Sequence, residues 1–140
     1  MISVNIISFV YRKKNNGAFL VHEKHRLAQK TFITPDDLIN EPLIIAKRTA
    51  VQNELINWFN NSPEKLNIVA TYNLILNAAN MVKHQIGVAL CFNLNFDNLY
   101  QDLRFIPLFP EIKTGAVLIW KKNHIYSQTM SHFIQSIKNA

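Results

Sequence analysis

Residues 67–92 constrain the fold of this chain more than any other segment. A β-branched pair, Ile68 and Val69, precedes a polar turn at 71–73, a helical stretch and, after Gly87, a second apolar run. A strand, a helix and a strand within about 26 residues match the length of a compact βαβ unit. Its strands run parallel, with a right-handed crossover. The polar turn then lies at the carboxyl end of a parallel strand, where open α/β sheets bind ligands.

Composition indicates a folded domain without a membrane segment. The chain has 140 residues, of which 49% are apolar, as is typical of one ordinary globular domain. No apolar stretch reaches the roughly 20 residues that cross a bilayer. Basic residues follow the apolar amino-terminal segment rather than precede it, which is the reverse of a secretory signal. The single cysteine, Cys91, lies in an apolar run and indicates a reduced compartment. We therefore expect a cytoplasmic protein.

The net charge of +6 is concentrated near the amino terminus, where residues 1–30 hold six Lys or Arg and one acid, Glu23. A basic segment can bind nucleic acid. No helix-turn-helix, zinc-ligand pattern or interleaved aromatic residues accompany it here. We interpret residues 13–17 as a solvated turn between two strands, at 2–11 and 18–22.

The rest of the chain alternates between strands and helices. Thr34, Pro35 and two acids predict a helix start, and Pro42 ends that short helix at about Asn40. An apolar stripe predicts that the helix over 49–60 packs on a core. Further strands are expected at 43–46, 104–108 and 115–120, a helical turn near 97–100, and a last helix after Ser127. This alternation predicts the α/β class with a mainly parallel sheet.

Several motifs resemble, in their order and spacing, those of the LysR-type transcriptional regulators. His25–Ala28, Thr34–Leu38 and Glu41–Ile44 resemble the HPLA, DL and EPLI motifs of that family. The βαβ unit resembles the family's helix–A-G-x-G-(V/I)–strand segment. The segments 103–107 and 116–121 and the Ser-capped last helix resemble its carboxyl end. The resemblance covers about residues 17–140.

Two positions depart from the family pattern. Arg26 stands where the family usually has proline, and Gly87 is all that remains of the usual glycine pair. We therefore expect the turn into the second strand of the βαβ unit to differ in shape.

The resemblance implies a periplasmic-binding-protein-like, two-lobed α/β fold with mainly parallel sheets. By analogy, residues 43–107 form a complete second lobe, and residues 1–42 with 108–140 form an incomplete first lobe. The implied function is the effector-sensing portion of a regulator that lacks its DNA-binding helix-turn-helix. Such a chain is expected to form a homo-oligomer, and to reach DNA only through that absent domain. The alternative is a non-sensing remnant or interaction module that associates with an intact relative.

The resemblance also implies where an effector binds, in strand-end loops and at helix amino termini. The candidate effector-binding residues lie in two turns: Thr71, Tyr72 and Asn73 in one, Lys47, Arg48 and Thr49 in the other. Hydroxyl, amide and free backbone N–H groups could hold an anion, and Arg48 could pair with an acid through two hydrogen bonds. The expected effector is a small molecule such as a carboxylate or an amino acid. The alternatives are helix capping by Thr71 or Asn73 and a solvated charge at Arg48.

The sequence gives no sign of an enzyme, a cofactor or a metal site. His22 and His25 stand three residues apart, but no Cys, Asp or third His completes a metal-ligand pattern. Three glycines in the whole chain exclude a GxGxxG or P-loop signature. No Ser-His-Asp order or paired-carboxylate motif is present. A third possibility, a solute-binding protein of similar fold, is disfavoured by the missing export signal.

Overall fold

The computed structural model describes residues 6–93, 101–121 and 124–139. The chain divides into two compact units, one within residues 15–114 and the other formed by the segments before and after it. Strands β1 (Ile6–His22) and β6 (Lys113–Lys121) contribute residues to both units and pair with each other. The predicted lobes, 43–107 and 1–42 with 108–140, stay a prediction.

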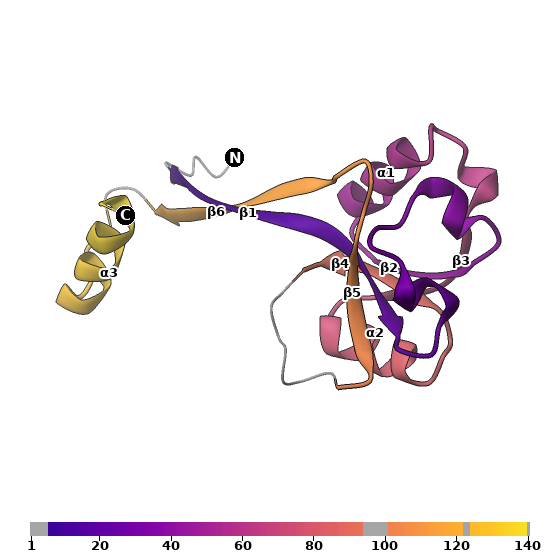
Figure 1. The fold of residues 1–140 in the computed structure, drawn as a ribbon. Helices are drawn as coiled ribbons and strands as arrows, with labels where there is room; N and C mark the ends of the chain where they lie inside the picture. Colours follow the sequence, from indigo (N-terminus) through magenta and orange to yellow (C-terminus); the bar gives the residue numbers. More distant parts are fainter. Residues whose placement is uncertain (1–5, 94–100, 122–123, 140) are drawn as a thin grey trace. The chain divides into compact units, whose positions relative to one another are not determined.

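A sheet with the strand order β3-β2-β4-β1-β5 forms the centre of the unit of residues 15–114 (Figure 1). β2 (Pro42–Ala46) lies between β3 (Asn67–Tyr72) and β4 (Val88–Phe92) and is parallel to both. β1 pairs antiparallel with β4 and with β5 (Leu103–Pro107). The α/β class is confirmed. The sheet is mixed, however, because parallel pairing is confined to the three strands that helix crossovers connect.

The predicted βαβ unit is present as β3, α2 (Ile75–Lys83) and β4. Its two strands are not neighbours, because β2 lies between them and pairs with each. The other crossover helix, α1 (Thr49–Trp58), joins β2 to β3. β2 is therefore the central strand of the parallel part of the sheet.

The predicted turn at 13–17 is wrong, because β1 continues without a break from Ile6 to His22. The carbonyl oxygen of Asn16 accepts a hydrogen bond from the N–H of Asn93 at 3.0 Å, and the N–H of Gly17 donates to the carbonyl oxygen of Ile112 at 2.6 Å. An Asn-Gly pair favours a hairpin turn when only local preferences act. Here the backbone partners on both sides hold it extended, so the basic residues before it belong to a strand.

The short elements begin and end close to where the sequence predicts. The segment 34–40 forms a 3₁₀ helix, Pro35–Leu38, and Asn40 beyond it has a φ of 65°. Two further 3₁₀ helices span Arg26–Gln29 and Pro63–Lys65. α3 (Gln128–Lys138) begins at Ser127, whose side chain accepts a hydrogen bond from the N–H of Met130 at 3.2 Å. The predicted helical turn at 97–100 lies outside the described residues.

Apolar side chains alternate between the two faces of the sheet and form two core clusters. Phe19, Leu43 and Val88 belong to the cluster that α1 covers through Leu55, together with Phe59 at the C-cap of that helix. Leu20, Ile44 and Ala89 belong to the cluster that α2 covers through Ala78, Ala79 and Val82. This period of two is what buried strands with a helix on each face require. The unit of residues 15–114 therefore has three layers, and the predicted apolar stripe of α1 packs in its core. No helix among the described residues is long and apolar enough to cross a bilayer.

Candidate functional site

The two predicted site turns lie next to each other at one edge of the sheet. Ala46 and Tyr72, the last residues of β2 and β3, are register partners, and the N–H of Lys47 donates to the carbonyl oxygen of Tyr72 at 2.9 Å. The predicted turn at 71–73 is partly wrong, because Thr71 and Tyr72 belong to β3, and Thr49 of the segment 47–49 already begins α1. The carboxyl ends of parallel strands, where α/β sheets bind ligands, thus bring the two turns together.

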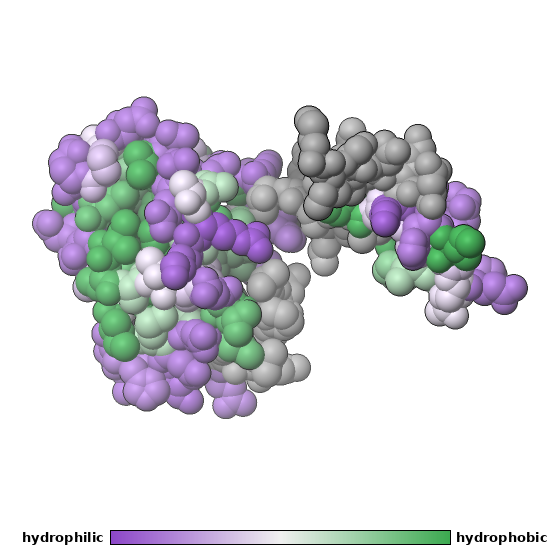
Figure 2. All heavy atoms as spheres, turned by 180° about the vertical axis from the view of Figure 1, so that it is seen from behind, coloured by the Kyte–Doolittle hydropathy of each residue, from purple (hydrophilic) through white to green (hydrophobic). Residues whose placement is uncertain are grey.

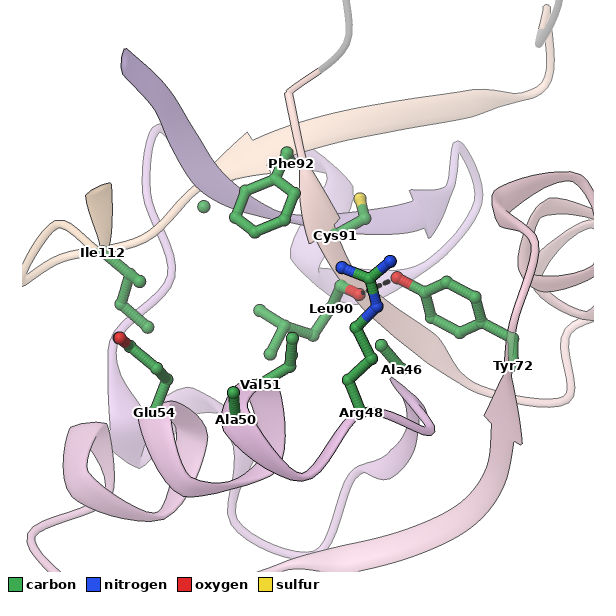
Figure 3. Close-up of a pocket in the computed structure, with 11 residues that line it drawn as sticks. Ala46, Arg48, Ala50, Val51, Glu54, Tyr72, Leu90, Cys91, Phe92 and Ile112 are labelled. Atoms are coloured by element: carbon green, nitrogen blue, oxygen red, sulfur yellow. Dashed lines mark hydrogen bonds between the residues drawn. The ribbon is translucent and has the colours of Figure 1, made fainter. Parts of the chain in front are cut away.

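A cavity of about 240 Å³ opens at this edge, where β2 and β4 end (Figure 3). All of its lining residues belong to the unit of residues 15–114. They are Gly17, Ala46, Arg48, Ala50, Val51, Glu54, Tyr72, Leu90, Cys91, Phe92 and Ile112. Of the predicted site residues, Arg48 and Tyr72 line the cavity. The other four do not line it and are exposed: Thr71 near the end of β3, Asn73 just after β3, Lys47 just after β2, and Thr49 as the first residue of α1.

Arg48 supplies the positive charge of the cavity. It occupies the N-cap position of α1, and its side chain forms no capping hydrogen bond. The first N–H groups of a helix have no acceptor inside the helix, and the helix dipole adds a partial positive charge there. Figure 3 shows the guanidinium group extending along the cavity toward the Tyr72 hydroxyl. A cation and the amino end of a helix therefore meet at one side of the cavity.

The Tyr72 hydroxyl already donates its proton to a hydrogen bond within the protein. The acceptor is the carbonyl oxygen of Leu90 at 2.7 Å. Burial, with a smaller contribution from Cys91, raises the pKa of Tyr72 well above its ordinary value, so the hydroxyl stays neutral. The phenolic oxygen keeps its lone pairs for a donor on a ligand. In this geometry Tyr72 accepts a hydrogen bond from a ligand rather than donating one to an anion.

Cys91 is a packing residue at the cavity wall and not a nucleophile. Its side chain belongs to the α2 core cluster, and the residue is 5% exposed. Burial raises the pKa of the Cys91 thiol to about 12, although a backbone hydrogen bond at Leu20 acts in the opposite direction. The reactive thiolate is therefore almost absent at neutral pH.

The predicted site omits Glu54, Phe92 and Ile112, all of which line the cavity. Glu54 lies one turn beyond Ala50 on the same face of α1, but no local signal shows that this face lines a cavity. Phe92 and Ile112 come from segments far apart in the sequence, and no local signal brings them together.

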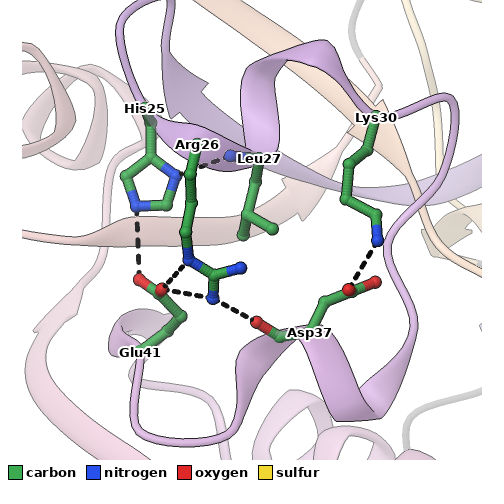
Figure 4. Close-up of polar contacts among 6 residues, drawn as sticks. All are labelled: His25, Arg26, Leu27, Lys30, Asp37 and Glu41. Carbon is green, nitrogen blue, oxygen red and sulfur yellow. Dashed lines mark hydrogen bonds and ion pairs between the residues drawn. The ribbon is translucent and has the colours of Figure 1, made fainter.

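A polar cluster beside the core joins side chains of the segments 25–30 and 37–41 (Figure 4). Glu41 accepts a hydrogen bond from Nε of Arg26 at 2.7 Å, and its other oxygen lies 3.2 Å from Nε2 of His25. The N–H of Leu27 donates to Nδ1 of His25 at 3.1 Å, which places the ring proton of a neutral His25 on Nε2, facing Glu41. His25 thus links two loops. No group of three His, Cys, Asp or Glu residues in the described part of the chain could hold a metal ion.

Comparisons with known proteins agree with this architecture. The sequence pattern of the LysR substrate binding domain matches residues 15–140. A search of curated proteins found no match. HinK, a LysR family transcriptional regulator from Pseudomonas aeruginosa, is similar in structure with a TM-score of 0.79 and 18% identity, covering 99% of this chain and 48% of that one. This chain therefore spans about half the length of HinK.

Two ligand complexes are also similar. The CcmR regulatory domain of Synechocystis PCC6803 in complex with 2-PG matches with a TM-score of 0.76 and 13% identity, over 99% of this chain and 68% of that one. The BenM effector binding domain with its effector benzoate matches with a TM-score of 0.70 and 20% identity, over 99% and 65%. At these identities the likeness shows the fold, which confirms the predicted periplasmic-binding-protein-like α/β class.

The family match extends over residues 15–140, which is nearly the whole chain. This family consists of domains of transcriptional regulators and not of enzymes, so the prediction of no enzymatic activity is confirmed. The protein belongs to the LysR substrate-binding domain family.

Proposed function

We propose that this protein senses a small-molecule effector, and that the cavity beside Arg48 binds the effector through a carboxylate or a similar anion. The single observation that carries the proposal is the cavity itself, which combines the Arg48 guanidinium group and a helix amino terminus with apolar walls. Relatives of the same fold carry benzoate in BenM and 2-PG in CcmR. The role of such a sensor is to convert effector binding into a change of a regulator's conformation.

The chemistry of the lining suits a small amphipathic anion. A carboxylate can accept two parallel hydrogen bonds from the Arg48 guanidinium group. Val51, Leu90 and Phe92 offer apolar surface to the rest of the ligand. The volume of about 240 Å³ is below the range of drug-sized pockets and suits a metabolite of few atoms. Thr71, Asn73, Lys47 and Thr49, at the same edge of the sheet, remain proposed effector-binding residues.

The test is a thermal melt of the chain with a panel of small carboxylates and amino acids. A ligand at one hundred times its dissociation constant should add about 2.7 kcal/mol to the free energy of unfolding. Arg48→Ala should abolish the shift. Arg104→Ala is the matched control, because Arg104 is an exposed arginine on β5 that does not line the cavity.

A chain that melts cooperatively and responds to no carboxylate would contradict the proposal. It would favour the alternative, an interaction module that senses nothing. An equal shift in wild type and Arg48→Ala would show that the ligand binds elsewhere.

We also propose that the protein forms a homo-oligomer through the exposed edge of β3. β3 is the end strand of the sheet order, and its Ile68 and Val69 are 45% and 47% exposed. Leu74 and Leu76, close in sequence, are exposed as well. Figure 2 shows apolar side chains gathered in a band on one face of the molecule. Unpaired strand edges with apolar side chains favour pairing with another chain.

Light scattering after size-exclusion chromatography measures the association. Val69→Lys should shift the chain toward the monomer, because a charge on an edge strand opposes pairing. The same substitution at exposed Ile119 of β6 is the control. A wild-type monomer at all concentrations would contradict the proposal.

A further inference from the structure

A carboxylate lines the cavity together with the cation. Glu54 lies on α1 four residues after Ala50 and three after Val51, and all three line the cavity. Residues with these spacings share one face of a helix. Figure 3 shows the Glu54 carboxylate near Ile112 and the Arg48 guanidinium group on the other side, near Tyr72, with Val51 and Leu90 between them. The cavity therefore has two oppositely charged ends and an apolar middle.

The two charges have no partner among the residues that the structure describes. Within the described part of the chain, neither Arg48 nor Glu54 takes part in an ion pair or a side-chain hydrogen bond, and both residues are exposed. By contrast, Glu41 and Asp37 have partners close to them. Each end of the cavity thus keeps its hydrogen-bonding capacity for a ligand.

An anion with a purely apolar tail fits this lining poorly. Its carboxylate can pair with Arg48, but its tail would displace water from Glu54 without offering a donor. A carboxylate that loses water and gains no partner opposes binding. A ligand with an amino group at that end meets Glu54 with a charge of the opposite sign.

We propose that Glu54 makes the cavity selective for carboxylates that carry an amino group at the far end of a short apolar chain. The inference rests on the proposed function, because it assigns the second end of the same cavity. Figure 3 shows the two charged groups at opposite ends of the cavity, with apolar side chains between them. Such a separation suits an ω-amino acid better than a molecule with both charges on one carbon. Glu54 is then a specificity-determining residue, since it rejects the ligand that lacks the amine.

Matched pairs of probes test the selectivity. The probes are hexanoate and 6-aminohexanoate, and butanoate and 4-aminobutanoate, titrated into the ¹⁵N-labelled chain at millimolar concentrations. The amide signals of residues at the start of α1 report occupancy in two-dimensional NMR spectra, even when binding is weak. The variants are Glu54→Gln, which keeps the shape of the side chain, Arg48→Ala, and the control Glu64→Gln. Glu64 is an exposed acid of the Pro63–Lys65 helix and does not line the cavity.

We expect 6-aminohexanoate to bind wild type about fivefold more tightly than hexanoate, as one partly exposed ion pair provides. In Glu54→Gln the ratio should fall to about one, and in Glu64→Gln it should remain. Two results would contradict the proposed selectivity and leave the proposed function standing. Either both probes bind through Arg48 with equal affinity, or Glu54→Gln leaves the ratio of the two affinities unchanged. If no probe moves any amide signal at the start of α1, both proposals fail together.

Discussion

The α-carbon of Gly87 faces the backbone of Pro42 so closely that a methyl group on it would lie 2.5 Å from the Pro42 carbonyl oxygen. Pro42 begins β2 and Gly87 directly precedes β4, which are parallel neighbours in the sheet. The glycine that this chain retains from the family's motif thus lets two strands begin side by side. Its value here lies in the missing side chain, since its backbone φ is not positive.

Gly87→Ala should lower the free energy of unfolding by about 1–3 kcal/mol, because the added methyl group meets backbone that cannot move aside cheaply. Urea unfolding followed by circular dichroism measures the loss. Gly17→Ala is the control, since its methyl group would first meet side-chain atoms of Ile112 and Leu108, both at 3.2 Å. It should cost less. Equal stability of Gly87→Ala and wild type would contradict the close approach of the two strands.

Glu41→Gln should destabilise the chain by about 1–2 kcal/mol, because a largely buried carboxylate loses its charge-assisted bonds to Arg26 and His25. The side chain of Glu41 is 14% exposed, so water replaces these bonds poorly. Glu64→Gln, at an exposed acid, should change the unfolding midpoint little. A loss no greater than that of the control would show that the polar cluster is only a surface arrangement.

Asp37 should make the chain less stable in acid. Burial tends to raise its pKa, but hydrogen bonds from Lys30 and from both the N–H and the hydroxyl of Thr34 outweigh burial and hold the pKa below its usual 3.8. The folded chain therefore binds this proton less readily than the unfolded chain does. The stabilisation by ionised Asp37 is complete above the ordinary pKa and is lost as the pH falls through the lowered value.

The comparison of wild type with Asp37→Asn across pH measures this contribution. The variant should be less stable by about 1 kcal/mol at neutral pH, and the difference should vanish in strong acid. Asp36→Asn is the neighbouring control, because Asp36 is exposed. A difference that stays constant down to strong acid would mean that the effect of the substitution does not depend on the charge.

Cys91 should react with thiol reagents only when the chain unfolds. Its burial leaves little thiolate at pH 8, since the pKa is raised to about 12. The labelling rate with a disulfide reagent should rise with urea in parallel with unfolding, and the rate in the fully unfolded chain provides the reference. Fast labelling of the folded chain, at a rate close to that reference, would show that the thiol is open to solvent.

Local signals predict the parts of this fold that depend on neighbours in sequence. Ser127 caps α3, and the stripe of α1 packs in the core, because each depends on residues within a turn or two. The turn predicted around Gly17 fails because Asn93 and Ile112, far along the chain, determine its backbone. For the same reason local patterns do not show that β2 lies between β3 and β4.

The candidate site, too, can be predicted only in part from the sequence. Arg48 and Tyr72 are found because the family resemblance implies an effector at strand-end loops, and local patterns show where the two strands end. Glu54 is missed, because its role depends on which surface α1 faces. That surface forms only when β4 and the segment around Ile112 are in place.

The position of β1 in the sheet also sets an order of events during synthesis. Ala18 pairs with Cys91 on one side and with Pro107 on the other. Both partners leave the ribosome long after β1 does. The two edges of β1 therefore stay unpaired until β4 and β5 have been synthesised. Long-range pairing of this kind slows folding and exposes intermediates to aggregation. β1 thus emerges before β4 and β5 but is paired on both edges only after them, and nascent chains should depend on chaperones until β5 has emerged.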